Sequence, residues 1–294
     1  MNAPNPAPRV PPHADARLFD VDCKLSYTLL DDTHFLFIVH ALDGLDQTVV
    51  EESLRITPAL EHEVHADAVL GHRKLRLKAG AGPLTLRYRA RVQVRRPPPD
   101  VTAAEIPIGE LPHEVLTELL PTRYCESDRL ASAAWKLFGD LPPGGARVRA
   151  ISDWIHDHVE YRTGSTDTTT TACDVFLQRA GVCRDFAHLG VTFCRALNIP
   201  ARLAVGYSRF DTPPPDFHAM FEAFLGGRWQ LFDPTRLAEP LDLVRIAVGR
   251  DAGDVAFATL FGTVRTRLIR PQVEQVRSRR ARRTAPKTTG TRGA

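Results

Sequence analysis

The chain has 294 residues, of which 43% are hydrophobic and 25% charged, and its formal net charge is +3. This composition is typical of a soluble globular protein with room for two domains, each burying a core of its own. No apolar run approaches the roughly 20 residues that a membrane span needs, and residues 1–16 lack the apolar core of a secretion signal, so we expect a cytoplasmic protein with no membrane partner.

The two ends of the chain differ in composition from the rest. Residues 1–16 are rich in proline and alanine and are predicted to form a disordered leader. Residues 277–294 contain seven basic side chains and no acidic one, and we predict a basic, disordered tail over residues 271–294. The tail lacks the interleaved aromatic side chains typical of nucleic-acid binding, so we do not expect nucleic acid as a partner.

From residue 17 to residue 96 the hydrophobic pattern has a period of two. In PLTLRYRARVQVR, residues 83–95, apolar residues alternate with polar ones, most of which are arginine. Similar runs upstream, separated by Gly, Asp and Pro, predict about six antiparallel strands in an N-terminal β-sandwich domain over residues 17–96. The arginines could bind an anion, but a solvated strand face is the simpler interpretation.

A proline-rich segment, RRPPPD at residues 95–100, opens the predicted linker over residues 97–112. Beyond it the hydrophobic period changes to about 3.6, which indicates helices. The predicted helices cover residues 113–120, 127–139 and 146–161. Strand-like stretches follow at 201–210, 218–227 and 228–235, with Gly226 and Gly227 forming a hairpin. We therefore predict an α+β fold in which the sandwich precedes an α+β domain over residues 113–270.

The five cysteines are odd in number and widely scattered. No pair has CxxC spacing and the histidines do not supply a matching second half, so we expect neither a disulfide framework nor a zinc site, and we predict no cofactor.

Cys183 stands at the start of a stretch with helical periodicity, CRDFAHLGVTFCRALN. At a helix N-terminus, the unpaired backbone N–H groups and the positive end of the helix dipole stabilise a thiolate and can bind an oxyanion. A free cysteine is more often a small buried core residue, and Cys194, in the middle of the same stretch, fits that interpretation.

Two downstream residues make a functional interpretation of Cys183 more attractive. His218 begins the alternating run HAMFEAFL, and Asp233 ends the next strand, where Pro234 confines it to extended geometry. The hairpin brings the His218 end and the Asp233 end of two antiparallel strands close together. A thiol, an imidazole and a carboxylate are the groups that thiol-dependent acyl transfer requires, although each residue alone could be an ordinary strand end or turn residue.

The segments GVCRDFAHLGVTFCRALNIPAR and HAMFEAFLGGRWQLFDPT resemble the transglutaminase-like superfamily, and the resemblance extends over residues 115–240. The upstream LLPTRYCESDRL and the β-rich N-terminal region resemble the bacterial branch, whose members are described as candidate cysteine proteases. The resemblance implies a papain-like α+β core in which Cys183 is the nucleophile, His218 the base and Asp233 the acid that orients the imidazole. Met220 departs from the family pattern, because many relatives have a tryptophan two residues after the histidine.

The second oxyanion donor does not carry over from the resemblance. Gln178, five residues before Cys183, and Trp154 are the candidates. The threonine-rich loop at 163–171 and the loop at 212–216 are predicted to flank a cleft and gate it.

The resemblance implies acyl transfer at amide bonds through a thioester, with a peptide or protein substrate. Water as the acceptor would make the protein a cysteine peptidase or amidase, and an amine would make it a cross-linking transglutaminase. We favour hydrolysis, because the chain has neither a DxDxDG-like calcium loop nor room for the extra β-domains of animal-type transglutaminases. A non-catalytic binding module that keeps the fold is a third interpretation.

Overall fold

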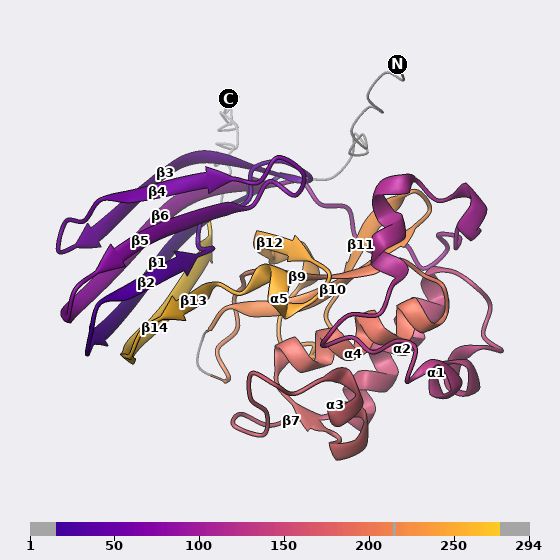
Figure 1. Cartoon of the computed structure of the whole chain (residues 1–294). Coiled ribbons are helices and arrows are strands. Elements are labelled where there is room, and N and C mark those ends of the chain that lie inside the picture. Colours follow the sequence, from indigo (N-terminus) through magenta and orange to yellow (C-terminus); the bar gives the residue numbers. More distant parts are fainter. Residues whose placement is uncertain (1–15, 214–215, 277–294) are drawn as a thin grey trace, which may run out of the picture.

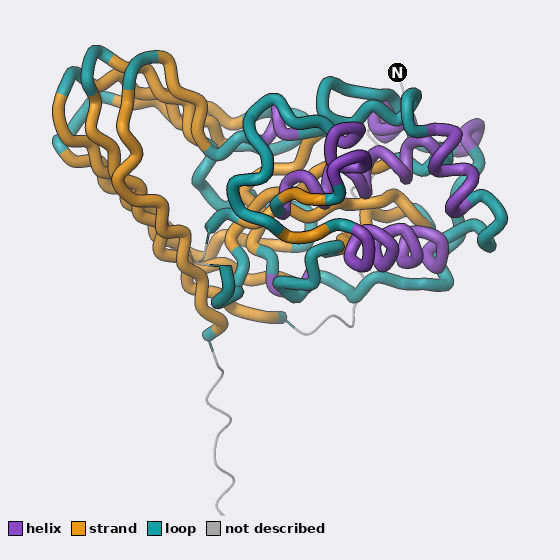
Figure 2. The backbone as a smooth tube through the Cα atoms, turned by 90° about the horizontal axis from the view of Figure 1, so that it is seen from below, coloured by secondary structure: helices purple, strands orange, loops and turns teal. Residues whose placement is uncertain are grey.

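The structure is a computed structural model that describes residues 16–213 and 216–276. The predicted leader, apart from residue 16, and the predicted tail beyond residue 276 lie outside the described residues. The described chain forms a β-sandwich beside a part that carries all of the described helices, which confirms the predicted α+β fold (Figure 1). Seen from below, the sandwich strands project to one side of the helical part (Figure 2).

The sandwich consists of two four-stranded antiparallel sheets with the orders β14-β1-β6-β3 and β13-β2-β5-β4. Their strands are β1 (Arg17–Leu29), β2 (Thr33–Phe37), β3 (Gln47–Thr57), β4 (His62–Ala66), β5 (Arg73–Ala79), β6 (Gly82–Val94), β13 (Ala258–Phe261) and β14 (Val264–Gln275). Along β1 and β6, every second side chain is buried, as the period-two pattern predicts. Burial of one face of each strand thus produces the sandwich core.

The sandwich also contains strands that come from the C-terminal end of the described chain. β13 pairs with β2, and β14 pairs with β1 along nearly its whole length. The predicted boundary between catalytic domain and tail, at residue 270, therefore falls inside β14. Pro271 interrupts the strand pattern there, because proline has no N–H to donate, but it is tolerated since β14 lies at the edge of its sheet.

The second part of the molecule has a four-stranded antiparallel sheet with the order β11-β10-β9-β12, and helices on it (Figure 1). Its strands are β9 (Ala201–Tyr207), β10 (His218–Leu225), β11 (Arg228–Phe232) and β12 (Val244–Gly249), and β7 (Glu160–Tyr161) and β8 (Ala180–Gly181) form a separate parallel pair. Its α-helices are α1 (Ala131–Phe138), α2 (Gly145–His158), α3 (Ala172–Gln178), α4 (Cys183–Ala196) and α5 (Ala252–Val255).

Three short 3-10 helices complete the described elements: η1 (Ile108–Glu110), η2 (His113–Leu119) and η3 (Pro240–Asp242). The segment predicted as a helix at 113–120 is thus a 3-10 helix. No helix in the described part of the chain is long and apolar enough to cross a membrane.

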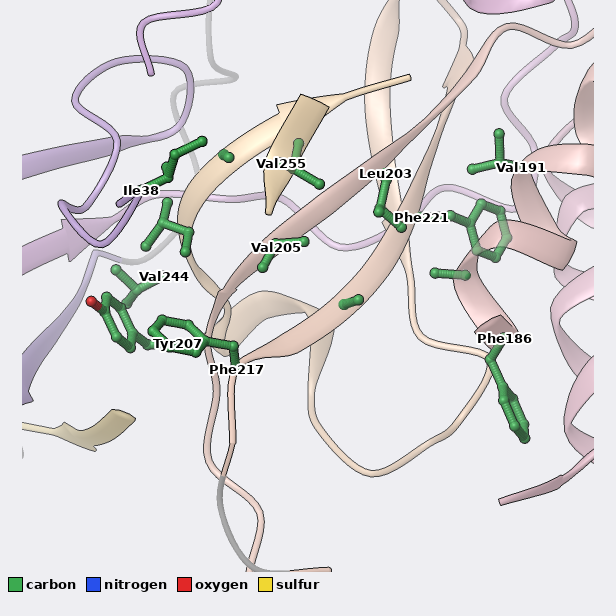
Figure 3. Packing of buried hydrophobic residues seen from close by; sticks show 14 of the residues in the cluster. Ile38, Phe186, Val191, Leu203, Val205, Tyr207, Phe217, Phe221, Val244 and Val255 are labelled. Atoms are coloured by element: carbon green, nitrogen blue, oxygen red, sulfur yellow. The ribbon is translucent and has the colours of Figure 1, made fainter. Parts of the chain in front are cut away.

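Helix α4 packs closely on β10, and a glycine makes this possible. A Cβ atom added at Gly190 would lie 2.5 Å from the ring of Phe221, so only glycine allows the strand's aromatic ring to approach the helix backbone. Figure 3 shows Phe221 pointing from its strand toward the helix that carries Val191. This contact sets the position of α4, and therefore of its first residue, relative to the start of β10.

A largely buried chain of charged side chains joins the sandwich to this sheet. Arg96 donates from Nε to Asp46 at 2.7 Å, and Arg245 of β12 bonds both Asp46 and Glu222. Glu222 of β10 also accepts from Arg202 of β9 at 2.6 Å. Burial would raise the pKa of Asp46, but the charges of Arg245 and Arg96 outweigh it and hold the pKa well below its usual value. The two parts of the molecule therefore share a buried ionic contact.

Candidate active site

Cys183 is the first residue of α4, as the helical periodicity predicts. The start of the helix is held by Asp185, whose carboxylate accepts the backbone N–H of Val182 at 2.9 Å and the hydroxyl of Thr166 at 2.6 Å. The Cys183 side chain is partly exposed, whereas the other four cysteines are buried. This is the exposure that a nucleophile needs.

The four other thiols have the environment of core residues. Burial raises the pKa of Cys23 and of Cys125 to about 12 and that of Cys173 to about 11, and it raises the pKa of Cys194 as well. These thiols stay protonated near neutral pH, and a protonated thiol is a poor nucleophile.

His218, the first residue of β10, is completely buried and bonds Asp233. Its Nε2 lies 2.9 Å from Oδ2 of Asp233. Burial alone would lower the pKa of His218, but the hydrogen bond with Asp233 and the proximity of Cys183 outweigh it and raise the pKa to about 10. The imidazole is therefore protonated at neutral pH.

Asp233 follows directly after β11, and both of its carboxylate oxygens are occupied. Oδ1 accepts the backbone N–H of Thr235 at 2.9 Å and its hydroxyl at 2.6 Å, and Oδ2 accepts the N–H of Ala238 at 3.1 Å besides the His218 bond. Burial would raise the pKa of Asp233, but these hydrogen bonds, with that of His218 the largest, keep the pKa below its usual value. The carboxylate is thus ionised and held in one orientation.

The start of α4 and the start of β10 meet at Cys183. The sulfur lies 3.9 Å from the carbonyl oxygen of Phe217, the residue before His218. The imidazole of His218 lies close enough to Cys183 for the thiol to contribute to its raised pKa. Because Asp233 occupies Nε2, the nitrogen left for the thiol is Nδ1, which is buried and has no hydrogen-bond partner in the described part of the chain. The structure therefore brings the three predicted residues together.

The two residues suggested as oxyanion donors have other contacts. The side-chain amide of Gln178, an exposed residue, donates to the carbonyl of Ala180 at 2.9 Å. Trp154 stacks on His158, with ring centroids 4.4 Å apart, and packs edge-on against Phe193 at 5.6 Å. Trp154 thus lies in an aromatic cluster between α2 and α4.

Tyr161 lies beside Cys183, and the sequence did not suggest it. Its backbone pairs with Gly181 in the parallel β7–β8 ladder, where the N–H of Arg162 donates to the carbonyl of Gly181 at 2.9 Å. The Tyr161 hydroxyl lies near the backbone and thiol of Cys183, and burial and the nearby thiol raise its pKa. A two-residue strand is too short for a periodic signal, and the sequence pattern extended the preceding helix to residue 161, although α2 ends at His158.

The threonine-rich loop contacts the first turn of α4, next to Cys183. Thr166 in the threonine-rich loop bonds Asp185, and the carbonyl of Asp167 accepts from Arg184 at 2.7 Å. The loop at 212–216 leads into Phe217, whose carbonyl faces the sulfur. Residues 214–215 of that loop lie outside the described residues. No group of three or more His, Cys, Asp or Glu side chains in the described ranges is arranged to hold a metal ion.

Comparison with known proteins gives the family. The profile of the transglutaminase-like superfamily matches residues 134–234, and that of the bacterial transglutaminase N-terminal domain matches residues 18–96. The crystal structure of a Cytophaga hutchinsonii protein, described as a candidate cysteine protease, has a TM-score of 0.83 with this chain at 40% identity. The likeness covers 90% of this chain and 92% of the other. This chain belongs to the transglutaminase-like superfamily.

Two mycobacterial relatives, both uncharacterised proteins, match over shorter stretches. The chain is 32% identical to one from Mycobacterium leprae over 146 residues, which are 47% of this chain and 52% of the relative. It is 39% identical to one from Mycobacterium tuberculosis H37Rv over 67 residues, 23% of this chain and 21% of the relative. This chain therefore spans about half of the first relative and less of the second. The transglutaminase-like core as matched contains Cys183, His218 and Asp233.

Proposed function

We propose that this protein is a thiol-dependent enzyme that hydrolyses amide bonds of peptides or proteins through a thioester on Cys183. One observation carries the proposal: a buried His218–Asp233 pair leaves the second imidazole nitrogen for a partly exposed thiol. These groups in this arrangement are what a nucleophilic cysteine needs, because the imidazole exchanges a proton with the sulfur while the carboxylate fixes the imidazole's orientation.

The first half of the reaction forms the thioester. The imidazolium of His218 carries its mobile proton on Nδ1 and stabilises the thiolate of Cys183. The sulfur attacks the carbonyl carbon of the substrate, a C–S bond forms, and the carbonyl π electrons move onto the oxygen. When this tetrahedral intermediate collapses, the C–N bond breaks and His218 gives its proton to the departing amine.

The second half returns the enzyme to its starting state. A water molecule attacks the thioester carbon and gives a proton to the now neutral His218. The C–S bond then breaks, the sulfur leaves as a thiolate beside the imidazolium, and the acid product departs. Asp233 keeps the Nε2–H of His218 in place throughout, because its own position is fixed by Thr235 and Ala238.

The negative oxygen of both tetrahedral intermediates needs hydrogen-bond donors. We assign this role to the backbone N–H of Cys183 at the helix N-terminus and to the hydroxyl of Tyr161. The hydroxyl lies within hydrogen-bonding reach of the Cys183 backbone, and its raised pKa keeps it protonated, so it is able to donate. Donors positioned before the reaction stabilise the developing charge without a cost of reorganisation.

Hydrolysis is favoured over amine transfer by the 40% identity to the Cytophaga hutchinsonii protein described as a candidate cysteine protease. The test is to incubate the full chain with a defined peptide mixture, with and without a fluorescent primary amine, and to analyse the peptides by mass spectrometry. We expect new peptide ends that disappear in Cys183→Ala and persist in the control Cys173→Ala. Incorporation of the amine at the expense of new ends would assign the protein to amine transfer instead.

Thiol reactivity tests the enzyme interpretation without knowledge of the substrate. We expect iodoacetamide at neutral pH to modify Cys183 at least about 100-fold faster than the four buried cysteines, which serve as controls within the same molecule. Replacing His218 by Gln should slow the reaction at Cys183 alone. If Cys183 reacted no faster than Cys173, the non-catalytic binding module would be the better interpretation.

A further inference from the structure

The outer face of the sheet β14-β1-β6-β3 carries a row of four cationic side chains, one from each strand. In the strand register, Arg270 of β14 lies opposite Lys24 of β1, Lys24 lies opposite Arg87 of β6, and Arg87 lies opposite Arg55 of β3. With neighbouring strands about 4.8 Å apart, the row extends about 14 Å across the sheet. We call these four residues the cationic row.

Like charges directly opposite one another destabilise a sheet, so the cationic row is unfavourable for the isolated fold. Asp22, two residues before Lys24 on the same face of β1, relieves it in part by accepting from Nε of Arg87 at 2.7 Å. Asp22 is also shared with Arg89 at 3.3 Å, so this part of the face keeps an excess of positive charge. Among residues 16–213 and 216–276, Lys24, Arg55 and Arg270 take part in no ion pair.

The row borders a hollow on the surface. A cavity of about 330 Å³ is lined by Ser53, Leu54, Arg55, Arg87 and Arg89, three of which are arginines. Guanidinium groups form paired hydrogen bonds with carboxylates and phosphates. The cavity provides a place where one anionic group could contact several of them at once.

The charges on the rest of the face limit the shape of the partner. Asp20 lies four residues before Lys24 on β1, about 14 Å away. It is opposite Glu274 of β14 on one side and Arg91 of β6 on the other, and Arg91 is in turn opposite Glu51 of β3. A flat anionic surface would meet this acidic row as well as the cationic row. A narrow anionic chain that lies across the strands would contact the cations alone.

The chemistry of the face also limits the partner. The described strands β1, β3, β6 and β14 present no aromatic side chain outward, because Phe19, Tyr27 and Tyr88 face the core. Single-stranded nucleic acids bind through stacking of bases on aromatic rings, which this face cannot provide. An extended peptide with acidic side chains at three alternate positions spans about 14 Å, which matches the row.

We propose that the cationic row is a docking site for an extended acidic segment of a partner protein. The inner face of the same sheet packs toward the catalytic part, where Tyr88 stacks on Tyr207 with ring centroids 6.5 Å apart. The row is thus on the opposite face from the catalytic part, and a segment bound there is held away from Cys183. The site anchors a partner and takes no part in bond cleavage.

The test measures binding of a fluorescein-labelled peptide of alternating Glu and Thr residues to the full chain by fluorescence anisotropy. The variant Lys24→Gln, Arg55→Gln, Arg270→Gln removes the three cations that have no ion pair. The matched control Lys74→Gln, Arg76→Gln, Lys78→Gln removes three cations from exposed positions of β5 in the other sheet. An alternating Gln and Thr peptide serves as the uncharged probe.

We expect the row variant to bind the acidic peptide about tenfold more weakly and the β5 control to bind it within about twofold of the unmodified chain. Binding should also weaken as salt rises from about 0.05 to 0.2 M, and the uncharged peptide should not bind. The melting temperature of the row variant should not fall, because repulsion between like charges is removed.

Several results would overturn the proposal. Failure of the unmodified chain to bind the acidic peptide, or equal weakening in both triple variants, would show that the row is not a site. If oligothymidylate or phosphatidylglycerol vesicles bound more tightly than the peptide, and only when the row is intact, the partner would be a nucleic acid or a membrane. None of these measurements depends on peptide cleavage, so they test the docking site independently of the proposed function.

Discussion

One strand, β10, carries two buried charged groups with different chemistry. His218 begins the strand, and Glu222, four residues later, lies in the ionic chain that joins the sheet to the sandwich. The carboxylate oxygens of Glu222 are both taken by guanidinium groups of Arg202 and Arg245, whereas His218 keeps one ring nitrogen for a partly exposed thiol. Burial and charge alone therefore do not mark a reactive site; an available atom that faces an accessible nucleophile does.

The largest effect is expected from a change in Asp233, the hydrogen-bond partner of His218. Asp233→Asn should lower kcat/KM for peptide cleavage by about 10⁴-fold, because an amide NH₂ facing Nε2 cannot accept its proton and removes the negative charge that orients and stabilises the imidazolium. The Asn oxygen can still accept from Thr235, so the fold should persist. Circular dichroism and kinetics check both points, and a loss of less than about tenfold would contradict the role of Asp233.

Glu222→Gln, in contrast, should lower the stability of the fold. The change leaves two buried guanidinium groups without a full counter-charge, and we expect the free energy of unfolding to fall by about 3–5 kcal/mol. The matched control is Glu63→Gln, which removes an exposed carboxylate paired with Arg76 and should cost less than about 1 kcal/mol. Urea titration measures both. Equal effects would mean that the buried chain contributes no more than a surface pair.

Tyr161→Phe separates the chemistry of the oxyanion from that of the thiol. Loss of one oxyanion donor should lower kcat for cleavage by about 10²–10³-fold. Alkylation of Cys183 by iodoacetamide forms no oxyanion, so its rate should stay within about twofold of the unmodified chain. A parallel fall in both rates would indicate that Tyr161 positions the thiol instead.

The pH dependence of stability tests the protonation state of His218. The pKa of His218 is raised to about 10 in the folded chain. The protonated His218–Asp233 pair therefore contributes stability that is fully present below the pKa of histidine in the unfolded chain, near 6.5. That contribution is lost as the pH rises through about 10. The difference in free energy of unfolding between the unmodified chain and His218→Gln, measured from pH 6 to pH 11, should therefore shrink over this range. A difference that does not change would contradict the protonated imidazole.

Much of the site and fold could be predicted from periodicity and residue chemistry. The helix start at Cys183 and the hairpin that carries His218 and Asp233 are local features, with turn and capping residues close in sequence. The position of Tyr161 could not be predicted, because a two-residue parallel pair with residues 180–181 leaves no periodic pattern. Strand β14 could not be predicted either, because Pro271 interrupts its hydrophobic pattern. This stretch is a strand because it pairs with β1 in the folded chain.

By itself, the sequence determined the class of fold, the alternation of the sandwich strands, and the thiol, imidazole and carboxylate available for chemistry. These follow from which side chains must be buried over a few turns or strand residues. The tertiary structure decided which polar groups meet: Glu222 with its two arginines, Tyr161 with Cys183, and four cations side by side across one sheet. Such contacts join residues far apart in the chain, and the hydrogen-bond register between strands, which no local pattern encodes, selects the partners.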